Sequence, residues 1–273
     1  MAMLPMLGLN SFAAKNLLIS DIDDTIKKTG IHSGGVAAHA LGTINEFAGM
    51  SILYGSWYKT TGASGKVEYL TAAPGVIDTL GLDFLRESGF PPGRGDIVNF
   101  VVSGRDPRSE NSGDFKARNL IEIYEQEKPE VMILIGDNGE QDITAYSELM
   151  KYVSGRNGTT RVYSFIHHVY ESAGMAIPSG HIPFVTAADL AVHFANHGWI
   201  REDGLTRVLG EIEYDSGAEK YKTAVKPDFM ECASFREWPE LSSGVLAQAS
   251  NASAIIASYA QVKANVTGLC QNY

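Results

Sequence analysis

Short apolar runs that alternate with helix-like segments are the feature that most narrows the folds open to this chain. Each run is bounded by turn-forming residues, and the runs are residues 16–20, 66–72, 96–102, 131–137 and 161–169. Between them the hydrophobic spacing is helical, over residues 34–50, 75–88, 114–128 and 142–153. Strands that alternate with helices form a parallel sheet covered by helices on both faces, so we expect an α/β fold with a central parallel sheet of about five strands.

The first apolar run ends in the sequence DIDDT, which places three carboxylates within four positions: Asp21, Asp23 and Asp24. Acids so close together repel one another and need a cation, hydrogen-bond donors or a raised pKa. Polar loops also follow the runs 66–72 and 131–137. Because ligands of parallel α/β sheets bind beyond the carboxyl ends of the strands, we expect these three loops to meet at one edge of the sheet.

The residue types in these loops suit phosphoryl transfer. A carboxylate at Asp21 can attack phosphorus to form an acyl-phosphate, and Asp23 can act as general acid and then as general base. Thr71 can donate its hydroxyl to a phosphoryl oxygen, and Lys116 can neutralise developing charge. Mg²⁺ prefers one or two carboxylates together with substrate oxygens and water, and Asp21 with Asp137 could supply them.

Four motifs, in this order along the chain, resemble those of the haloacid dehalogenase superfamily of phosphotransferases. They are DIDDT, YLTAAP, DFKARNL with its Lys116, and LIGDNGEQD. Further stretches resemble the family of phosphatidate phosphatase catalytic domains related to lipins and to the yeast actin-patch phosphatidate phosphatase. These stretches are DIDDTIK, FAGMSILY, ESGFPPG, GDNGEQDITAY and IPFVTAADLAVHFANHGWI. The resemblance covers residues 16–200, which we expect to form the phosphatase domain, with residues 201–273 as a C-terminal extension packed on it or appended to it.

The resemblance implies a three-layer Rossmann-like fold with a small cap or none, and a Mg²⁺-dependent phosphomonoesterase that acts through an aspartyl-phosphate. It implies Asp21 as nucleophile, Asp23 as acid and base, and Mg²⁺ held by Asp21, the backbone carbonyl of Asp23 and Asp137. Asp142 would support the metal as the second acid of its motif.

Three further residues of these loops receive supporting roles. We interpret Asp24 as a hydrogen-bonding partner within its loop. Thr25 either supports the phosphate loop through its hydroxyl or caps the next turn. Asn138 is expected to support the acidic loop that Asp137 begins.

Two departures from the family pattern leave the substrate open. Ala73-Pro74-Gly75 stand where family members often carry a serine and an aromatic residue, and His167-His168 stand where an arginine often occurs. Both departures lie where we expect the substrate to be selected. Residues 27–66 and 75–115 leave no room for a large lid, although a small helical cover around Phe47, Met50 and Tyr54 is compatible with the sequence.

Several functions therefore remain as alternatives. An open site favours a phosphorylated substrate that is lipid-borne, such as phosphatidate, over a small buried metabolite. The same chemistry on a phosphoprotein, a sugar phosphate or a nucleotide is the first alternative. A non-catalytic module that binds phosphatidate is an alternative of another class, and the presence of both Asp21 and Asp23 speaks against it.

Charge and hydropathy exclude other partners. The formal net charge of −10 argues against binding to nucleic acid, which requires a basic surface. No apolar run approaches the ~20 residues of a transmembrane segment. After residue 200, the stretch 200–217 is polar and rich in turn-forming residues, and the Ala/Ser-rich stretch 245–264 is a helix candidate. The oligomeric state stays open.

Our prediction of the cellular compartment depends on two weak signals in the sequence. Cys232 and Cys270 form a single disulfide if the protein is exported, or they are two unrelated buried thiols. Residues 11–13 resemble a small-x-small cleavage site, but no basic segment precedes the short apolar run, so residues 1–16 are either a plain lead-in or a shortened signal peptide. We expect a periplasmic or secreted protein, with the cytoplasm as the alternative.

Overall fold

The computed structural model describes residues 16–30, 46–72, 78–93, 111–156, 158–171 and 176–271. The strands are β1 (Asn16–Ser20), β2 (Gly65–Tyr69), β3 (Val131–Asp137), β4 (Arg161–His167) and β5 (Ile182–Phe184). The helices that flank the sheet are α2 (Met50–Thr61), with the short 3-10 turn η2 (Gly62–Ser64), α3 (Asp78–Glu87), α4 (Ser112–Glu127), α5 (Asp142–Ser154) and α6 (Ala187–Asn196). The C-terminal helices are α7 (Glu202–Gly217), α8 (Lys222–Val225), α9 (Ser243–Gln248) and α10 (Ala252–Gln271).

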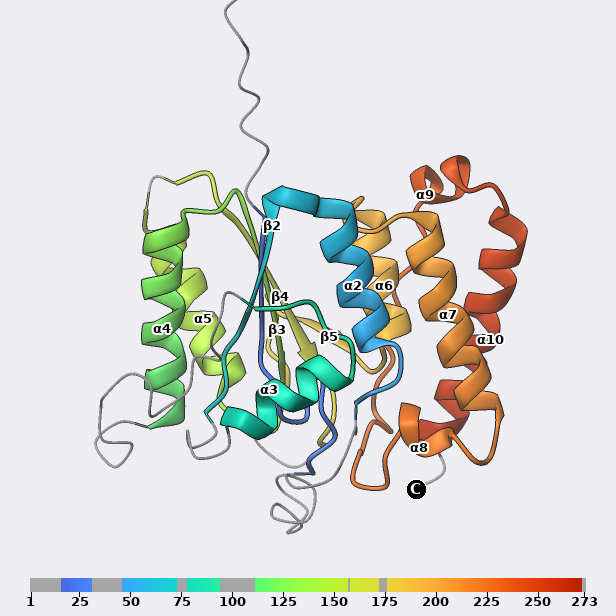
Figure 1. Cartoon of the computed structure of the whole chain (residues 1–273). Coiled ribbons are helices and arrows are strands. Elements are labelled where there is room, and N and C mark those ends of the chain that lie inside the picture. Colours follow the sequence, from blue (N-terminus) through green and yellow to red (C-terminus); the bar gives the residue numbers. More distant parts are fainter. Residues whose placement is uncertain are drawn as a thin grey trace, which may run out of the picture.

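The five strands form one parallel sheet in the order β2-β1-β3-β4-β5, which confirms the predicted α/β class (Figure 1). From β1 the chain first adds β2 on one side and then builds β3, β4 and β5 on the other. Ser20 pairs with Tyr69 on one side and with Ile135 on the other, so β1, β2 and β3 end close to one level. The loops after β1 and β3 therefore leave the sheet next to each other, at the point where the direction of strand addition reverses.

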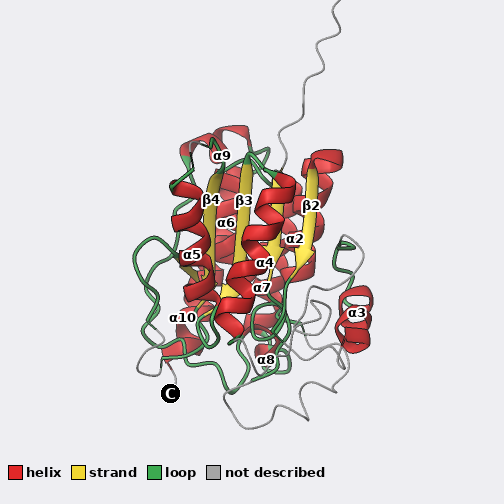
Figure 2. Ribbon diagram, turned by 90° about the vertical axis from the view of Figure 1, so that its left-hand side faces the viewer, coloured by secondary structure: helices red, strands yellow, loops and turns green. Residues whose placement is uncertain are grey.

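The sheet separates two apolar cores because successive side chains of a strand point to opposite faces. Leu17 and Ile19 face a cluster that includes Leu120 of α4 and Leu149 of α5. Leu18 faces the larger cluster, which contains side chains from α2, α6, α7 and α10. Figure 2 shows α4 and α5 in front of the sheet and α2, α6 and α7 behind it. Full burial of each large aliphatic side chain contributes about 1.5–3 kcal/mol, so the two cores hold the three layers together.

Some of the predicted helices and strands are present in the structure, and others lie outside the described residues. The helices predicted over residues 114–128 and 142–153 are confirmed as α4 and α5. The predicted strand 96–102 lies outside the described residues, as does most of the predicted helix 34–50. The fifth strand of the described sheet is instead the three-residue β5, which follows β4.

The segment after residue 200 differs from the expectation of a polar, turn-rich stretch. It forms the 16-residue helix α7. Four apolar residues spaced three or four apart give this helix one fully buried face, formed by Leu205, Val208, Leu209 and Ile212. That face packs against α2 and α6, and tertiary burial outweighs the polar composition of the rest of the helix.

The residues around which the sequence allowed a small cover have another place in the structure. Phe47, Met50 and Tyr54 are buried in the core of the α2 layer. The Tyr54 hydroxyl lies 2.8 Å from Ser20 Oγ, and the Phe47 ring packs edge-on against His167 with 4.5 Å between centroids. These side chains therefore support the ends of β1 and β4 from within, and they form no lid.

The C-terminal residues pack on the α2–α6 layer. α10 lies along α7, and its buried side chains join the same apolar cluster as those of α2 and α6. Of the two apolar neighbours in α10, Ile255 is buried while Ile256 is 49% exposed. Cys232 is disulfide-bonded to Cys270, so the structure selects the pairing that the sequence left open. The boundary at residue 200 stays a prediction.

Among the described residues, no helix combines the length and the apolar character that a membrane span requires.

Candidate active site

Asp21 is the first residue after β1 and is 1% exposed. Its amide donates to the carbonyl of Ile135 in β3, which fixes its backbone to the sheet at 2.9 Å. Both carboxylate oxygens have donors: Lys116 Nζ lies 2.8 Å from Oδ1, and the Thr25 hydroxyl donates to Oδ2 at 3.1 Å. The side chain predicted to be the nucleophile is thus held in one orientation by two groups from different elements.

Lys116 lies in the first turns of α4, a helix whose N-terminus is capped by the Asn111 side chain. Its ammonium group is fully buried and contacts three carboxylates: Asp21 at 2.8 Å, Asp142 at 2.7 Å and Glu140 at 3.0 Å. Burial alone would lower the pKa of Lys116, but these acids together raise it above its ordinary value. Lys116 is therefore a permanent cation inside the acidic site.

The acidic loop after β3 begins with Asp137, which is fully buried. Its Oδ1 accepts hydrogen bonds from the amides of Gly139 and Glu140, at 2.5 and 3.1 Å. Its Oδ2 is buried without a hydrogen-bond partner among the described residues. The amide of Asp137 donates to Asp142 Oδ2 at 3.2 Å, so α5 begins directly beside the end of β3.

Four carboxylates gather at this point. One oxygen each of Asp21, Asp137, Glu140 and Asp142 lies within 4.8 Å of the other three. Burial first, and then the neighbouring acids, raise the pKa of Asp21, Asp137 and Asp142 above the ordinary range, with Lys116 opposing the effect. Hard divalent cations prefer such all-oxygen sets. The unpartnered oxygen of Asp137 is a further reason that the site fits a metal ion, because a buried carboxylate oxygen without a donor is costly.

Glu140 was given no role by the sequence, although it lies within the acidic motif. The turn after Asp137 brings its carboxylate within 3.0 Å of Lys116. A signal was present in the sequence, since Glu140 is one of three acids in the stretch 137–142. The direction in which its side chain points depends on the loop backbone, which the spacing alone does not define.

Asp23 lies at the open edge of the cluster and is half-buried. Burial, together with the charge of Glu140, raises the pKa of Asp23 to about 6. Thr71, which follows β2, places its hydroxyl 3.4 Å from Asp23 Oδ2, a long contact at the limit of a hydrogen bond. The structure therefore brings Asp23 and Thr71 to the same edge as Asp21, while Ala73-Pro74-Gly75 lie outside the described residues.

The three supporting residues lie around the acids. Thr25 contacts Asp21 directly through its hydroxyl. Asp24 is buried and turned away from the cluster; the Tyr170 hydroxyl donates to its carboxylate. Asn138 Oδ1 accepts hydrogen bonds from the amides of Val169 and Tyr170, at 2.9 and 3.0 Å, and so ties the acidic loop to the segment after β4.

The two histidines at the end of β4 have different surroundings. His167 is buried, and its ring nitrogens face the carbonyls of Asp24, Thr25 and Val185. Burial lowers the pKa of His167 to about 4, although these carbonyls oppose the shift. A neutral, enclosed ring of this kind packs the acid turn against β4 and does not face a substrate. His168 is half-buried beside Phe235.

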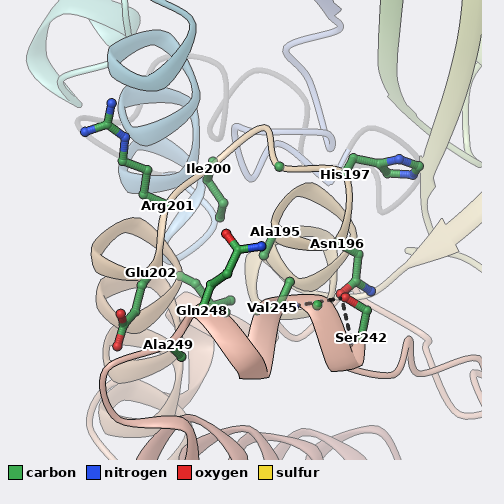
Figure 3. A pocket seen from close by; sticks show the side chains of 13 residues that line it. Ala195, Asn196, His197, Ile200, Arg201, Glu202, Ser242, Val245, Gln248 and Ala249 are labelled. Atoms are coloured by element: carbon green, nitrogen blue, oxygen red, sulfur yellow. Dashed lines mark hydrogen bonds between the residues drawn. The ribbon is translucent and has the colours of Figure 1, made fainter.

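A separate groove lies at the other end of the sheet from the acidic cluster. Figure 3 shows it between the end of α6, the start of α7 and α9. Its volume is about 440 Å³. Since α6 runs antiparallel to the strands, its last residues lie far from the ends of β1 and β3 (Figure 1). Asn196 and Ser242 in its wall are already hydrogen-bonded to each other, and this groove contributes nothing to the acidic site.

A parallel sheet of this kind, with aspartates at the ends of β1 and β3 and a buried lysine between them, defines a haloacid dehalogenase-like protein of the phosphatase class. The sequence matches the family described as "Phosphatidate phosphatase APP1, catalytic domain" over residues 16–162. The chain belongs to this family, which confirms the resemblance found in its motifs.

A curated relative is "Phosphatidate phosphatase APP1" of Saccharomyces cerevisiae, which is 29% identical over 135 residues. The match covers 48% of this chain and 22% of the yeast protein. The chain thus matches only about a fifth of the length of this relative. The family match over residues 16–162 includes the ends of β1 and β3 that carry the acids.

Proposed function

We propose that this protein is a Mg²⁺-dependent phosphomonoesterase that acts through an aspartyl-phosphate formed on Asp21. The observation that carries the proposal is the placement of Asp21. Its carboxylate is fixed between Lys116 and Thr25 at the end of β1, within the four-acid cluster. Family membership supports phosphatase chemistry in general, and this placement supports the particular nucleophile.

In the first step a carboxylate oxygen of Asp21 attacks phosphorus, and the bond from phosphorus to the ester oxygen breaks. Asp23 gives its proton to the departing oxygen, so the alcohol leaves uncharged. Burial and Glu140 raise the pKa of Asp23 to about 6, which keeps a larger share of it protonated near neutral pH than an exposed aspartate would retain. Lys116 remains beside Asp21 and offsets the negative charge that gathers there.

In the second step water attacks the phosphorus of the aspartyl-phosphate, and the bond to the Asp21 oxygen breaks. Asp23, now ionised, takes the proton of that water. Inorganic phosphate leaves and the Asp21 carboxylate is restored. Thr71, at the same edge, can donate its hydroxyl to a phosphoryl oxygen in both steps.

The metal would be held by Asp21 and Asp137, with the backbone carbonyl of Asp23 as a further ligand. The unpartnered Oδ2 of Asp137 supports this assignment. Glu140 and Asp142 complete the acidic cluster around Lys116, and we propose a supporting role for them. When bound, Mg²⁺ offsets the repulsion between carboxylates and phosphate and polarises the phosphoryl group.

For the substrate we propose phosphatidate or another lipid-borne phosphate. The name of the yeast relative supports this choice, as does the absence of a lid in the α2 region of the described residues. A phosphoprotein, sugar phosphate or nucleotide would require the same chemistry at the same residues. A purely phosphatidate-binding module would not require Asp21 and Asp23 to lie beside Lys116.

We also propose that the protein works in an oxidising compartment, either the periplasm or outside the cell. The pairing of Cys232 with Cys270 supports this, because structural disulfides persist mainly in exported proteins.

The test is Mg²⁺-dependent phosphate release from a panel of p-nitrophenyl phosphate, short-chain phosphatidate, sugar phosphates, nucleotides and phosphopeptides. We expect release from phosphatidate, and its loss below about 1% of wild type in Asp21→Asn, because the amide cannot act as the nucleophile. Asp83→Asn serves as the matched control, since Asp83 is half-exposed on α3 and its ion pair among the described residues is with Arg86.

The outcomes separate the proposals. Release from another substrate class alone would overturn the lipid substrate and keep the mechanism. Near-native activity of Asp21→Asn would overturn the nucleophile. Tight binding of phosphatidate without release from any substrate would favour the binding module over the enzyme.

A further inference from the structure

Asp24 fixes the turn that carries Asp23. Its Oδ1 accepts hydrogen bonds from the amide and hydroxyl of Thr29, at 2.8 and 2.9 Å, and from the amide of Gly30, at 2.6 Å. Asp24 has a φ of 54°, in the left-handed region that an aspartate keeps only where its contacts hold it. The direction of the adjacent Asp23 side chain therefore depends on what holds Asp24.

Tyr170, which follows β4, holds the other carboxylate oxygen. Its hydroxyl donates to Asp24 Oδ2, across 146 positions of sequence. Its main chain is fixed to Asn138, through the amide at 3.0 Å and through the carbonyl at 2.6 Å. Its ring lies against Gly139, where an added Cβ would come within 2.4 Å of a ring carbon. Tyr170 thus joins the acid turn after β1 to the acidic loop after β3.

A segment of the C-terminal part covers Tyr170. The Phe229 ring stacks on the Tyr170 ring, with 6.4 Å between centroids and 27° between planes. The amide of Glu231 donates to the carbonyl of Val169 at 2.6 Å, and its carboxylate accepts the amide of Glu171 at 3.2 Å. Glu231 therefore holds the main chain of both neighbours of Tyr170 in place.

This bracing segment, residues 229–234, is itself anchored by the disulfide. Cys232 lies at its centre and is bonded to Cys270 in α10. α10 packs along α7, on the outer side of the helices that cover one face of the sheet (Figure 1). Both Tyr170 and the bracing segment lie beyond residues 16–162, so the family match assigns them no role.

We propose that Tyr170 is a positioning residue for phosphoryl transfer, and that the disulfide-anchored bracing segment keeps Tyr170 in place. The inference rests on the proposed phosphatase function. Tyr170 acts through Asp24 on the acid–base residue Asp23, and it leaves the groups that hold phosphate untouched. A small displacement of a catalytic group can cost up to about 100-fold in rate, so loss of this contact lowers turnover more than substrate binding.

The first experiment is Tyr170→Phe, which removes only the hydroxyl. We expect kcat to fall about tenfold or more, with KM within about twofold of wild type. The control is Tyr259→Phe in α10, which loses a partly buried hydrogen bond, 2.7 Å long, from a buried tyrosine to the carbonyl of Pro239. The control lies in the same C-terminal part but has no contact with Asp24, and its kcat should match wild type.

The second experiment does not depend on activity. Hydrogen exchange of the Thr29 and Gly30 amides reports how firmly Asp24 holds them. We expect exchange to become faster in Tyr170→Phe and in the double variant Cys232→Ala, Cys270→Ala. It should stay at the wild-type rate in Tyr259→Phe.

The outcomes are distinct. Wild-type kcat in Tyr170→Phe, in a preparation whose parent is active, overturns the positioning role and leaves the phosphatase proposal standing. Faster exchange with an inactive parent supports the link and overturns the phosphatase. If the double cysteine variant has the kcat and the exchange rates of wild type, the proposed role of the bracing segment in holding Tyr170 is overturned. If Tyr170→Phe does not fold, the double cysteine variant carries both measurements.

Discussion

Lys116 holds three carboxylates with one ammonium group, and none of these four side chains is largely exposed to water. Removal of the cation from a buried ion cluster leaves negative charges that the interior cannot solvate. We expect Lys116→Met, without metal, to lower the free energy of unfolding by about 3–5 kcal/mol. Urea denaturation with and without Mg²⁺ measures the free energy of unfolding. Added Mg²⁺ should restore part of the stability that Lys116→Met loses.

The matched control for that prediction is Lys222→Met. Lys222 forms an ion pair with Glu219, and the two side chains are 36% and 87% exposed. Such a pair contributes no more than about 1 kcal/mol. Equal losses in the two variants would mean that Lys116 does not act as the counter-ion of the acidic site.

Some residues of the site could be predicted from the sequence, and others could not. Asp21 and Asp137 follow strands that a simple apolar pattern identifies, and neighbouring parallel strands end at the same edge, so their proximity could be expected. Lys116 was placed by its motif, at the start of a periodic helix. Glu140 and Tyr170 could not be placed, because their side chains are directed by irregular loops whose backbone no periodicity defines. The roles of all these residues stay predictions.

At the scale of elements, α6 packs on the sheet through a residue that can titrate. His193 lies against the Phe165 ring, with 5.4 Å between centroids. Burial, and then the charge of His197, lower the pKa of His193 to about 4. In the unfolded chain the pKa is near 6.5, so the unfolded state takes up the proton first. The stability linked to His193 is therefore full above pH 6.5 and is lost as the pH falls toward 4.

We expect the stability gap between wild type and His193→Gln to narrow by about 1–2 kcal/mol from pH 7.5 to pH 5. Denaturation of both proteins at both pH values measures it. Asp189 on the same helix, whose pKa burial raises to about 6, is common to both proteins and cancels in the comparison. A gap that stays constant with pH would show that His193 titrates normally in the folded protein.

Elements also differ in how well a sequence predicts them. α4 and α5 are long and strongly periodic, and both were predicted near their observed bounds. α7 was missed because its polar composition hid four apolar residues at helical spacing. β5 has only three residues, too few for alternation to be recognised, and it is defined by its pairing with β4.

At the scale of the whole molecule, the disulfide closes the C-terminal part into one unit. Cys232 and Cys270 are 38 positions apart, and a loop of that length loses chain entropy in the unfolded state when it is closed. We expect the double variant Cys232→Ala, Cys270→Ala to lose about 4 kcal/mol of unfolding free energy. Urea denaturation of oxidised wild type and of the variant tests it. Equal midpoints would show that the bond adds no net stability.

The contact between Asp24 and Tyr170 also joins two segments that are synthesised at different times. Translation proceeds from the amino end, so the acid turn is made early, while its partner hydroxyl follows 146 residues later. Contacts of such long sequence separation form late in folding. A nascent chain that already carries every aspartate of DIDDT still lacks the strand end that holds their turn in shape. The acids of this turn are thus synthesised first, but their arrangement can be completed only after the chain has grown by a further 146 residues.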